Sequence, residues 1–294
     1  MIGTTVEVEP VNAEPKVSVV MCAKNEEKYI GVAIESILHQ TYPNVELVVI
    51  DDGCSDGTPE IVRAFNDPRV RLYANNSGPH GAAAGRNLGV KLSTGTLVAL
   101  QDADDYSYPN RIELQVRAQA IGHKPRVVGS WIEERLGERV RVRRLPTSHG
   151  DIVAGFHRFC NRVTFVSGTM LFPRSVWLAV PERPQFQYME DWDQLCRIAE
   201  ADAVEFCNVP EPLFVYNIRP KGVKGKSAWP LYNVFERACR ARRRAGLDEW
   251  SSIEEFRTYL AGFHPGSLWW RGLWGMIQVK RSWEMRRLAE RLGV

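Results

Sequence analysis

The sequence lacks several short patterns that mark well-known kinds of catalytic or binding site. It contains no GxxxxGK phosphate loop, no GxSxG nucleophile turn and no pair of cysteines at CxxC spacing. Its six histidines are scattered, and none has the spacing of a zinc site. No apolar run approaches the length needed to span a bilayer. The chemistry must therefore come from side chains that the fold brings together.

The cysteines are few and widely spaced, and several lie in apolar runs. They are Cys22, Cys54, Cys160, Cys196, Cys207 and Cys239. We predict free, buried thiols in a reducing compartment rather than a disulfide framework. Because the N-terminus is acidic and has no apolar core, we expect no signal peptide. The predicted location is cytoplasmic, and peripheral attachment to the inner face of the membrane is compatible with it.

Composition and charge are those of an ordinary globular protein. The 294 residues are 44% hydrophobic and 25% charged, which is enough for a sizeable core. The net charge of +3 is too small to imply nucleic-acid binding, and we expect none. From residue 230 to the end, 12 Lys and Arg stand against 7 Asp and Glu. An anionic substrate or a membrane surface near that end is therefore one hypothesis.

Over the first hundred residues, short β-branched runs alternate with segments of helical periodicity. The predicted strands are residues 17–22, 45–50, 70–73 and 97–100. Strands joined through helices by short connections indicate an α/β fold with a parallel sheet. We expect Asn25 to cap the first helix.

After residue 124 the pattern predicts a more antiparallel region. The expected strands are 127–132, 140–144, 164–172 and one or two within 206–216, with helices at 175–180 and 190–201. Helical periodicity follows from residue 228 onward. The sequence thus divides into a flexible tail (1–15), a parallel half (16–124), a second half (125–220) and a basic loop with a C-terminal helical extension (221–294).

Polar residues follow three of the predicted parallel strands, where ligands bind in such sheets. These are residues 23–26, Asp51 with Asp52, and the acidic run 102–105. Carboxylates such as those of Asp102 and Asp104 suit Mg²⁺ or Mn²⁺, which then bridge to phosphate oxygens. The alternative is an acidic turn without a ligand, since Asp is common where a strand ends.

Two further polar groups of the first half each allow two interpretations. Asp52 either caps a turn or accepts the imide N–H of uracil or the hydroxyls of a ribose. Arg86 lies in a segment rich in glycine and alanine, and it is either a surface arginine or a phosphate contact that small neighbours permit.

In the second half, Glu190 and Asp191 open a predicted helix. Acids favour that position on dipole grounds alone, but one of them could also be a general base for an acceptor hydroxyl. A carboxylate at a helix start ordinarily has a lowered pKa, so such a base needs help from burial or from the shape of the transition state. A basic segment that could close over a diphosphate follows further on. Its charged residues are Arg219, Lys221, Lys224 and Lys226.

Together these motifs resemble a known family. Residues 17–26, 33–43, 48–58, 84–89 and 102–105 are similar to consecutive elements of the inverting, family-two nucleotide-sugar glycosyltransferases with the GT-A fold. The resemblance is dense over residues 16–120 and thinner over 164–219. It implies a mixed, mainly parallel sheet flanked by helices, with a nucleotide-sugar-binding half at 16–124 and an acceptor-binding half at 125–220.

The resemblance also implies roles for individual residues. Cys22, Ala23 and Asn25 would line the base pocket, with Glu26 near the ribose or diphosphate, Asp52 on the uracil and Arg86 on the diphosphate. Asp102, Ala103 and Asp104 would form the DXD motif, with Asp102 and Asp104 serving ribose and metal and Asp104 the direct ligand of Mn²⁺ or Mg²⁺. Asp191 would be the catalytic base and Glu190 its acceptor-binding neighbour. The implied donor is a UDP-sugar, and the acceptor a glycan, lipid-linked or small-molecule hydroxyl.

The sequence departs from the family's pattern in places. Arg219 stands where some relatives have a metal-binding histidine, so a third protein ligand is not expected. Residues 194–198 resemble the QxxRW box of processive synthases but lack its tryptophan, which disfavours processive synthesis.

Other interpretations remain open. A non-catalytic sugar-nucleotide-binding protein of the same fold, or less readily a nucleotidyltransferase, would also fit the motifs. The aromatic segment 268–277 could pack on the catalytic domain, on a second subunit or at a membrane interface.

Overall fold

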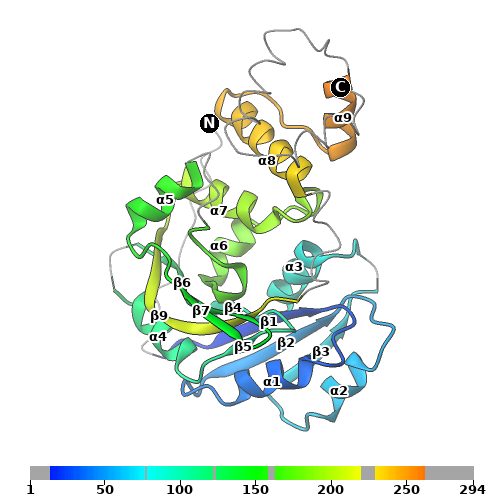
Figure 1. The fold of residues 1–294 in the computed structure, drawn as a ribbon, viewed down its shortest axis with the longest axis vertical. Coiled ribbons are helices and arrows are strands. Elements are labelled where there is room, and N and C mark those ends of the chain that lie inside the picture. Colours follow the sequence, from blue (N-terminus) through cyan, green and yellow to red (C-terminus); the bar gives the residue numbers. More distant parts are fainter. Residues whose placement is uncertain (1–13, 77, 122–123, 158–162, 220–228, 262–294) are drawn as a thin grey trace.

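The computed structural model describes residues 14–76, 78–121, 124–157, 163–219 and 229–261. Within them one sheet is covered by helices on both faces (Figure 1). The strand order is β3-β2-β1-β4-β8-β6-β9-β5, with β7 paired to β6 on the side of this path. This mixed, helix-flanked sheet agrees with the predicted fold class.

The parallel half is close to the prediction. Its strands are β1 (Val17–Ala23), β2 (Val45–Asp51), β3 (Val70–Ala74) and β4 (Leu97–Leu100), joined through α1 (Ile30–Leu38), α2 (Thr58–Ala64) and α3 (Ala82–Leu92). β1 pairs in parallel with β2 and β4, and β2 with β3. The carboxyl ends of β1, β2 and β4 therefore lie at one edge of the sheet.

The second half holds shorter pieces and one long ladder. It comprises β5 (Tyr106–Ser107), α4 (Arg111–Gln119), β6 (Arg126–Leu136), β7 (Arg139–Arg143), α5 (His149–His157), η1 (Ser167–Thr169), β8 (Leu171–Pro173), α6 (Arg174–Ala179), η2 (Pro184–Phe186), α7 (Glu190–Glu200) and β9 (Glu205–Asn217). β8 joins β4 to β6 by antiparallel pairing, whereas β6 and β9 run parallel. The expectation of a more antiparallel region holds for four pairings of this half, whereas its longest ladder, β6 with β9, is parallel.

Side-chain alternation along the strands builds two cores. On β1, Val17, Val19 and Met21 join a cluster with Ile30 and Ile34 of α1 on one face. Val20 points to the other face, where Val90, Trp177 and Leu195 come from α3, α6 and α7. Both faces of β1, β2 and β4 are thus buried, which explains why most of their residues are apolar.

Helix α3 lies unusually close to β1 because it presents glycines to the strand. A Cβ atom on Gly85 would lie 2.2 Å from Cys22 Sγ, and one on Gly89 would lie 2.4 Å from Val20 Cγ1. Since real side chains do not approach so closely, both positions require glycine. This close packing brings Arg86 to the sheet edge where the acidic residues lie.

Two local predictions are wrong, and two elements were not predicted. Asn25 does not cap the first helix, because α1 begins after Tyr29. Asn25 instead has φ 57° and accepts a hydrogen bond from the Ser55 N–H at 2.7 Å, a backbone conformation that asparagine tolerates. Residues 164–172 do not form one strand, because a 3₁₀ turn precedes the short β8. The sequence did not predict β5 or α5.

The C-terminal part that the structure describes is helical, as predicted. α8 (Trp229–Arg244) and α9 (Ile253–Ala261) lie beyond α7, at the top of Figure 1. Phe235 of α8 stacks on Phe186 of η2 at a centroid distance of 4.9 Å. Among the described residues, no helix is both long and apolar enough to cross a bilayer. The aromatic segment 268–277 and most of the tail 1–15 lie outside the described residues.

Candidate active site

The acidic turn after β4 is held in place by backbone and amide contacts. The Gln101 side chain donates to the carbonyls of Asp102 and Asp105 at 3.0 and 3.1 Å. Asn217 of β9 donates its backbone N–H to Asp105 Oδ1 and its side-chain amide to the Asp104 carbonyl, both at 2.7 Å. The other Asp105 oxygen is buried without a partner in the described residues. Burial, then the charges of Asp102 and Asp104, raise the pKa of Asp105 to about 9, so this carboxyl supports the turn in its neutral form.

Asp104 lies between the first strand and the last. Its Oδ2 is 2.5 Å from an Arg219 nitrogen, and the same guanidinium donates to Glu26 at 2.9 and 3.0 Å. Burial and the neighbouring Asp102 charge raise the pKa of Asp104 to about 6 despite this arginine. Arg219 therefore neutralises the two carboxylates predicted to face a metal and a diphosphate.

Arg86 is the centre of a second charged group. It comes within 3.5 Å of Asp102, 3.2 Å of Glu182 and 3.7 Å of Glu190. Burial alone would lower the pKa of this guanidinium, but Glu182, Asp102, Glu190 and Asp191 together raise it. One arginine thus faces four carboxylates from three separate segments. We call Arg86, Asp102, Glu182, Glu190 and Asp191 the Arg86 cluster.

Glu182 is a member of this cluster that the sequence did not predict. Its side chain is fully buried, and burial raises its pKa to about 8 although Arg86 opposes the shift. Asn87, the neighbour of Arg86, donates to the Glu182 carbonyl at 2.7 Å and accepts from its backbone N–H at 3.2 Å. Neither spacing nor periodicity marks Glu182, because its position depends on contacts between residues 95 apart in the chain.

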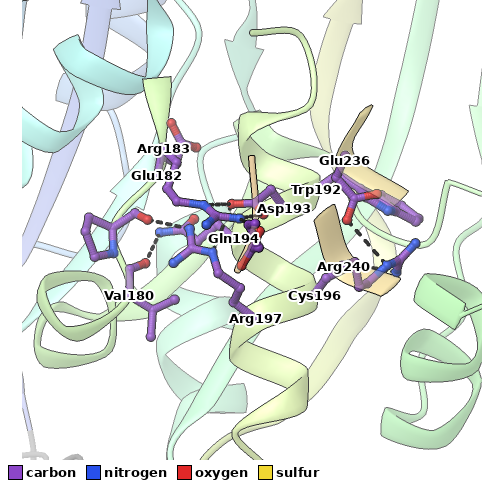
Figure 2. Close-up of polar contacts among 12 residues, drawn as sticks. Val180, Glu182, Arg183, Trp192, Asp193, Gln194, Cys196, Arg197, Glu236 and Arg240 are labelled. Atoms are coloured by element: carbon purple, nitrogen blue, oxygen red, sulfur yellow. Dashed lines mark hydrogen bonds and ion pairs between the residues drawn. The ribbon is translucent and has the colours of Figure 1, made fainter. Parts of the chain in front are cut away.

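The loop that carries Glu182 is fastened to α7, as Figure 2 shows. Gln194 donates to the Val180 carbonyl at 2.8 Å. Asp193 accepts from Arg183 and from Arg197, each at 2.9 Å. Since α7 begins at Glu190, these contacts fix the first turn of the helix relative to Arg86.

Glu190 and Asp191 are buried at the start of that helix, and their pKa values are raised. For Glu190 the causes are burial and then the Asp191 charge, and for Asp191 they are burial and then Asp102, with Arg86 opposing in both cases. Asp191 Oδ1 accepts the Trp192 N–H at 2.7 Å, while Glu190 Oε2 has no partner in the described residues. The structure thus supplies the burial that a base at a helix start needs.

At the ends of β1 and β2, Asp52 is buried and already bonded. Its oxygens accept from Asn75 at 2.8 Å, His80 at 3.0 Å and the Gly81 N–H at 2.7 Å. Among the described residues, Asp52 Oδ2 accepts from the Gly81 N–H alone, so it keeps an acceptor position, which a nucleobase contact would require. The predicted role of Asp52 stays a prediction.

The neighbouring residues predicted for the base pocket lie at the same edge. Cys22 and Ala23 are the last residues of β1, and Asn25 follows in the loop. Burial and then the Asp52 charge raise the pKa of Cys22 to about 12, so its thiol stays neutral. The five cysteines in the described part of the chain are free. Cys196 and Cys239 are buried as predicted, whereas Cys22, Cys54 and Cys207 are only partly buried.

Most of the predicted site residues therefore lie together around the acidic turn, and three lysines could not be placed. Asp102, Ala103 and Asp104 lie between Arg86 and Arg219, with Glu26 on one side and Glu190 and Asp191 on the other. Lys221, Lys224 and Lys226 lie outside the described residues.

The carboxylates at this site could coordinate a divalent metal only if a bound ligand or water supplied the remaining coordinating oxygens. No group of three or more His, Cys, Asp or Glu side chains suited to a metal occurs in the described part of the chain. Asp102 and Asp104 offer carboxylate oxygens, which Mg²⁺ and Mn²⁺ accept as one or two protein ligands beside phosphate and water.

Comparison with known proteins identifies the family. The family model described as Glycosyl transferase family 2 matches residues 18–177, more than half of the chain. The chain belongs to glycosyl transferase family 2. This membership confirms the resemblance found in the sequence.

Curated glycosyltransferases match part of the chain. An Escherichia coli UDP-Glc:alpha-D-GlcNAc-diphosphoundecaprenol beta-1,3-glucosyltransferase is 41% identical over 100 residues, which cover 34% of this chain and 39% of the relative. A putative Bacillus subtilis glycosyltransferase is 39% identical over 123 residues, or 41% of this chain and 44% of the relative. The chain thus spans about two fifths of the length of these relatives.

Solved glycosyltransferases share the fold. Staphylococcus aureus TarS with UDP-GlcNAc matches with TM-score 0.62 and 20% identity, over 82% of this chain and 70% of that one. Mycobacterium tuberculosis glucosyl-3-phosphoglycerate synthase, in complex with Mn²⁺ and UDP, gives TM-score 0.56 and 22% identity over 83% and 85%. The predicted GT-A fold is thereby confirmed.

Proposed function

We propose that this family 2 member is a metal-dependent, inverting glycosyltransferase that moves a sugar from a UDP-sugar to an acceptor hydroxyl. The observation that carries the proposal is the Arg86 cluster. It joins Asp102 at the end of β4 to Glu190 and Asp191 at the start of α7. A donor-side carboxylate and a buried candidate base therefore face one another across a single arginine.

The donor side fits a nucleotide diphosphate. Cys22, Ala23, Asn25 and Asp52 lie at the carboxyl ends of β1 and β2, where nucleotides bind in such sheets. Arg86 and Arg219 flank the acidic turn and are suited to phosphate oxygens. The choice of UDP draws on relatives whose names or structures contain it.

Asp102 and Asp104 would hold the divalent metal, which supplies charge neutralisation for the leaving diphosphate. In the structure Arg219 pairs with Asp104, and Arg86 lies beside Asp102. We infer that Arg219 turns from Asp104 toward the diphosphate when the donor binds, since both groups attract the same guanidinium.

Asp191 is the proposed general base. Its raised pKa, caused by burial and then by Asp102, makes it a better proton acceptor than an exposed aspartate. The Asp191 carboxylate takes the proton of the acceptor hydroxyl as that oxygen attacks the anomeric carbon and the bond to the diphosphate breaks. Glu190, with one free buried oxygen, would orient the acceptor. One displacement inverts the anomeric configuration.

Other parts of the interpretation stay predictions. These are the cytoplasmic location, a homodimer or membrane contact through the C-terminal helices, and the glycan, lipid-linked or small-molecule nature of the acceptor. No observation favours a non-catalytic role or nucleotide transfer over sugar transfer.

The test is hydrolysis or transfer from a set of UDP-sugars with Mn²⁺, followed by EDTA. We expect one UDP-sugar to be consumed, activity to fall by at least about 100-fold in EDTA and to return with Mn²⁺. The product should have the anomeric configuration opposite to that of the donor. Full activity in EDTA, or retention of configuration, would contradict metal dependence or the single displacement respectively.

A further inference from the structure

Exposed hydrophobic side chains gather on three adjoining strands beside the proposed site. Ten large hydrophobic residues are exposed among those that the structure describes, and five belong to the ends of β6 and β9 and to β7. They are Leu136, Val140, Val142, Tyr216 and Ile218, with exposed fractions of 43%, 58%, 44%, 36% and 38%. β6 pairs with both β7 and β9, so these strand ends form one surface (Figure 1).

The strand register sorts these side chains onto two faces. Arg139 is paired with Leu136, Arg141 with Glu134, and Glu134 in turn with Tyr216. Because paired residues share a face of a sheet, we call Glu134, Leu136, Arg139, Arg141 and Tyr216 the arginine face. Val140 and Val142 alternate with its arginines and lie on the opposite face.

The arginine face is positively charged. The Glu134 carboxylate is neutralised by Arg143 at 3.0 Å. Arg139 and Arg141 are exposed, and no hydrogen bond or ion pair joins either of them to another described side chain. Two guanidinium groups are therefore open to an anionic partner, next to the apolar surface of Leu136 and Tyr216.

This face begins at the proposed active site. Burial raises the pKa of Tyr216 to about 12, and Asp102, Asp105 and Asp104 are the next causes, so the tyrosine lies close to the acidic turn. Its neighbour Asn217 bonds that turn directly. Since paired strands lie about 4.8 Å apart, β7 is about 10 Å from β9. A molecule whose hydroxyl enters the site could have its anionic part on Arg139 and Arg141.

We propose that the arginine face docks on an anionic lipid surface and presents the site to an acceptor held there. The position of the site rests on the proposed function, whereas the docking does not. Arginine binds lipid phosphate groups, and tyrosine is favoured at the boundary between headgroups and acyl chains. A second copy added along the free edge of β7 would use its backbone groups instead and would not need the arginines.

The test is co-sedimentation of the full chain with vesicles of phosphatidylcholine alone or with about one third phosphatidylglycerol. We expect binding only to the anionic vesicles. The variant R139A/R141A should bind about 30-fold more weakly, because each arginine near such a surface contributes about fivefold. The control V140S/V142S changes the same strand on its opposite face and should bind like wild type.

Several outcomes would overturn the docking proposal. These are no preference of the wild type for anionic vesicles, unchanged binding by R139A/R141A, or equal losses in the two variants. A dimer that forms without vesicles, equally in wild type and in R139A/R141A, would identify a second copy paired along β7 as the occupant. Because binding needs no donor, vesicle binding in a protein that transfers no sugar would refute the proposed function alone.

Discussion

Buried acids at the two edges of the parallel sheet differ in the number of donors around them and in the direction of their pKa shifts. At the amino edge, Glu46 accepts from Ser18 at 2.6 Å, from Lys16 at 2.9 Å and from the Thr94 N–H at 2.7 Å. Burial alone would raise its pKa, but the hydrogen bonds from Ser18, Lys16 and Thr94 lower it to about 2. At the carboxyl edge, four carboxylates share Arg86, and burial raises the pKa of Glu182 to about 8.

This difference distinguishes carboxylates that stabilise the fold from carboxylates that are available to a ligand. A carboxylate with enough donors stabilises the fold and has little capacity left for a ligand. A group with more acids than donors destabilises the folded protein until a cation, a proton or a substrate joins it. Perturbed acids at the carboxyl edge therefore indicate the site, whereas the equally buried Glu46 does not.

Of the substitutions at the two edges, removing Arg86 should lower the free energy of unfolding the most. R86A leaves several buried carboxylates without their cation, and we expect it to lower the free energy of unfolding by about 3–5 kcal/mol. Chemical denaturation measures the change. R86K keeps the charge but loses the planar fork, so it should be more stable than R86A while still losing transfer activity. Equal stability of R86A and wild type would contradict the central place of Arg86.

Removing the charge of Glu46 should affect stability alone. E46Q replaces a carboxylate oxygen by an amide NH₂ group, which faces the N–H donors of Lys16 and Thr94 and cannot accept from them. We expect this substitution to lower the free energy of unfolding by about 2–3 kcal/mol at pH 7. Since the folded pKa of about 2 lies below the ordinary value of 4.5, the charge stabilises wild type above about pH 4.5. That advantage should shrink as pH falls toward 2, as pH-dependent denaturation of both proteins would show. A lower kcat in the folded variant would argue against a purely structural role.

Replacing Glu182 should change the pH dependence of stability in the opposite direction. Its folded pKa of about 8 lies above the ordinary value of 4.5, so the folded protein binds the extra proton between these values. Wild type should therefore lose stability as pH rises from about 5 to 8. E182Q cannot ionise at this position, so its melting temperature should rise relative to that of wild type as pH increases over this range. A difference that is constant with pH would mean that Glu182 is fully neutralised by Arg86.

Sequence patterns predicted the parallel half well because its elements are local. Strand β4 has the predicted bounds, and β1, β2 and β3 differ by one residue at the end. Buried parallel strands are largely apolar, and helices separate them, so each run can be recognised alone. Asn25 was misassigned because a side chain that caps a helix and one that bonds a neighbouring loop look alike in sequence.

The second half was harder because its structure depends on distant contacts. β8 has three residues and exists through pairing with β4 and β6, so no periodicity can reveal it. Glu182 reaches the site through Asn87 and Arg86 in the same way. The resemblance to a family pointed to Glu190 and Asp191, but sequence alone could not show that their burial raises the pKa values a base requires.

The measurement that bears most directly on the proposed site compares D191N with wild type. With Mn²⁺ and the UDP-sugar that the protein accepts, we expect D191N to lower kcat by about 10²- to 10⁴-fold. Donor binding, measured by the thermal shift on adding the UDP-sugar, should be nearly unchanged, because Asp191 faces the acceptor. Transfer by D191N at the wild-type rate would contradict the assignment of the base and, with it, the interpretation of the Arg86 cluster.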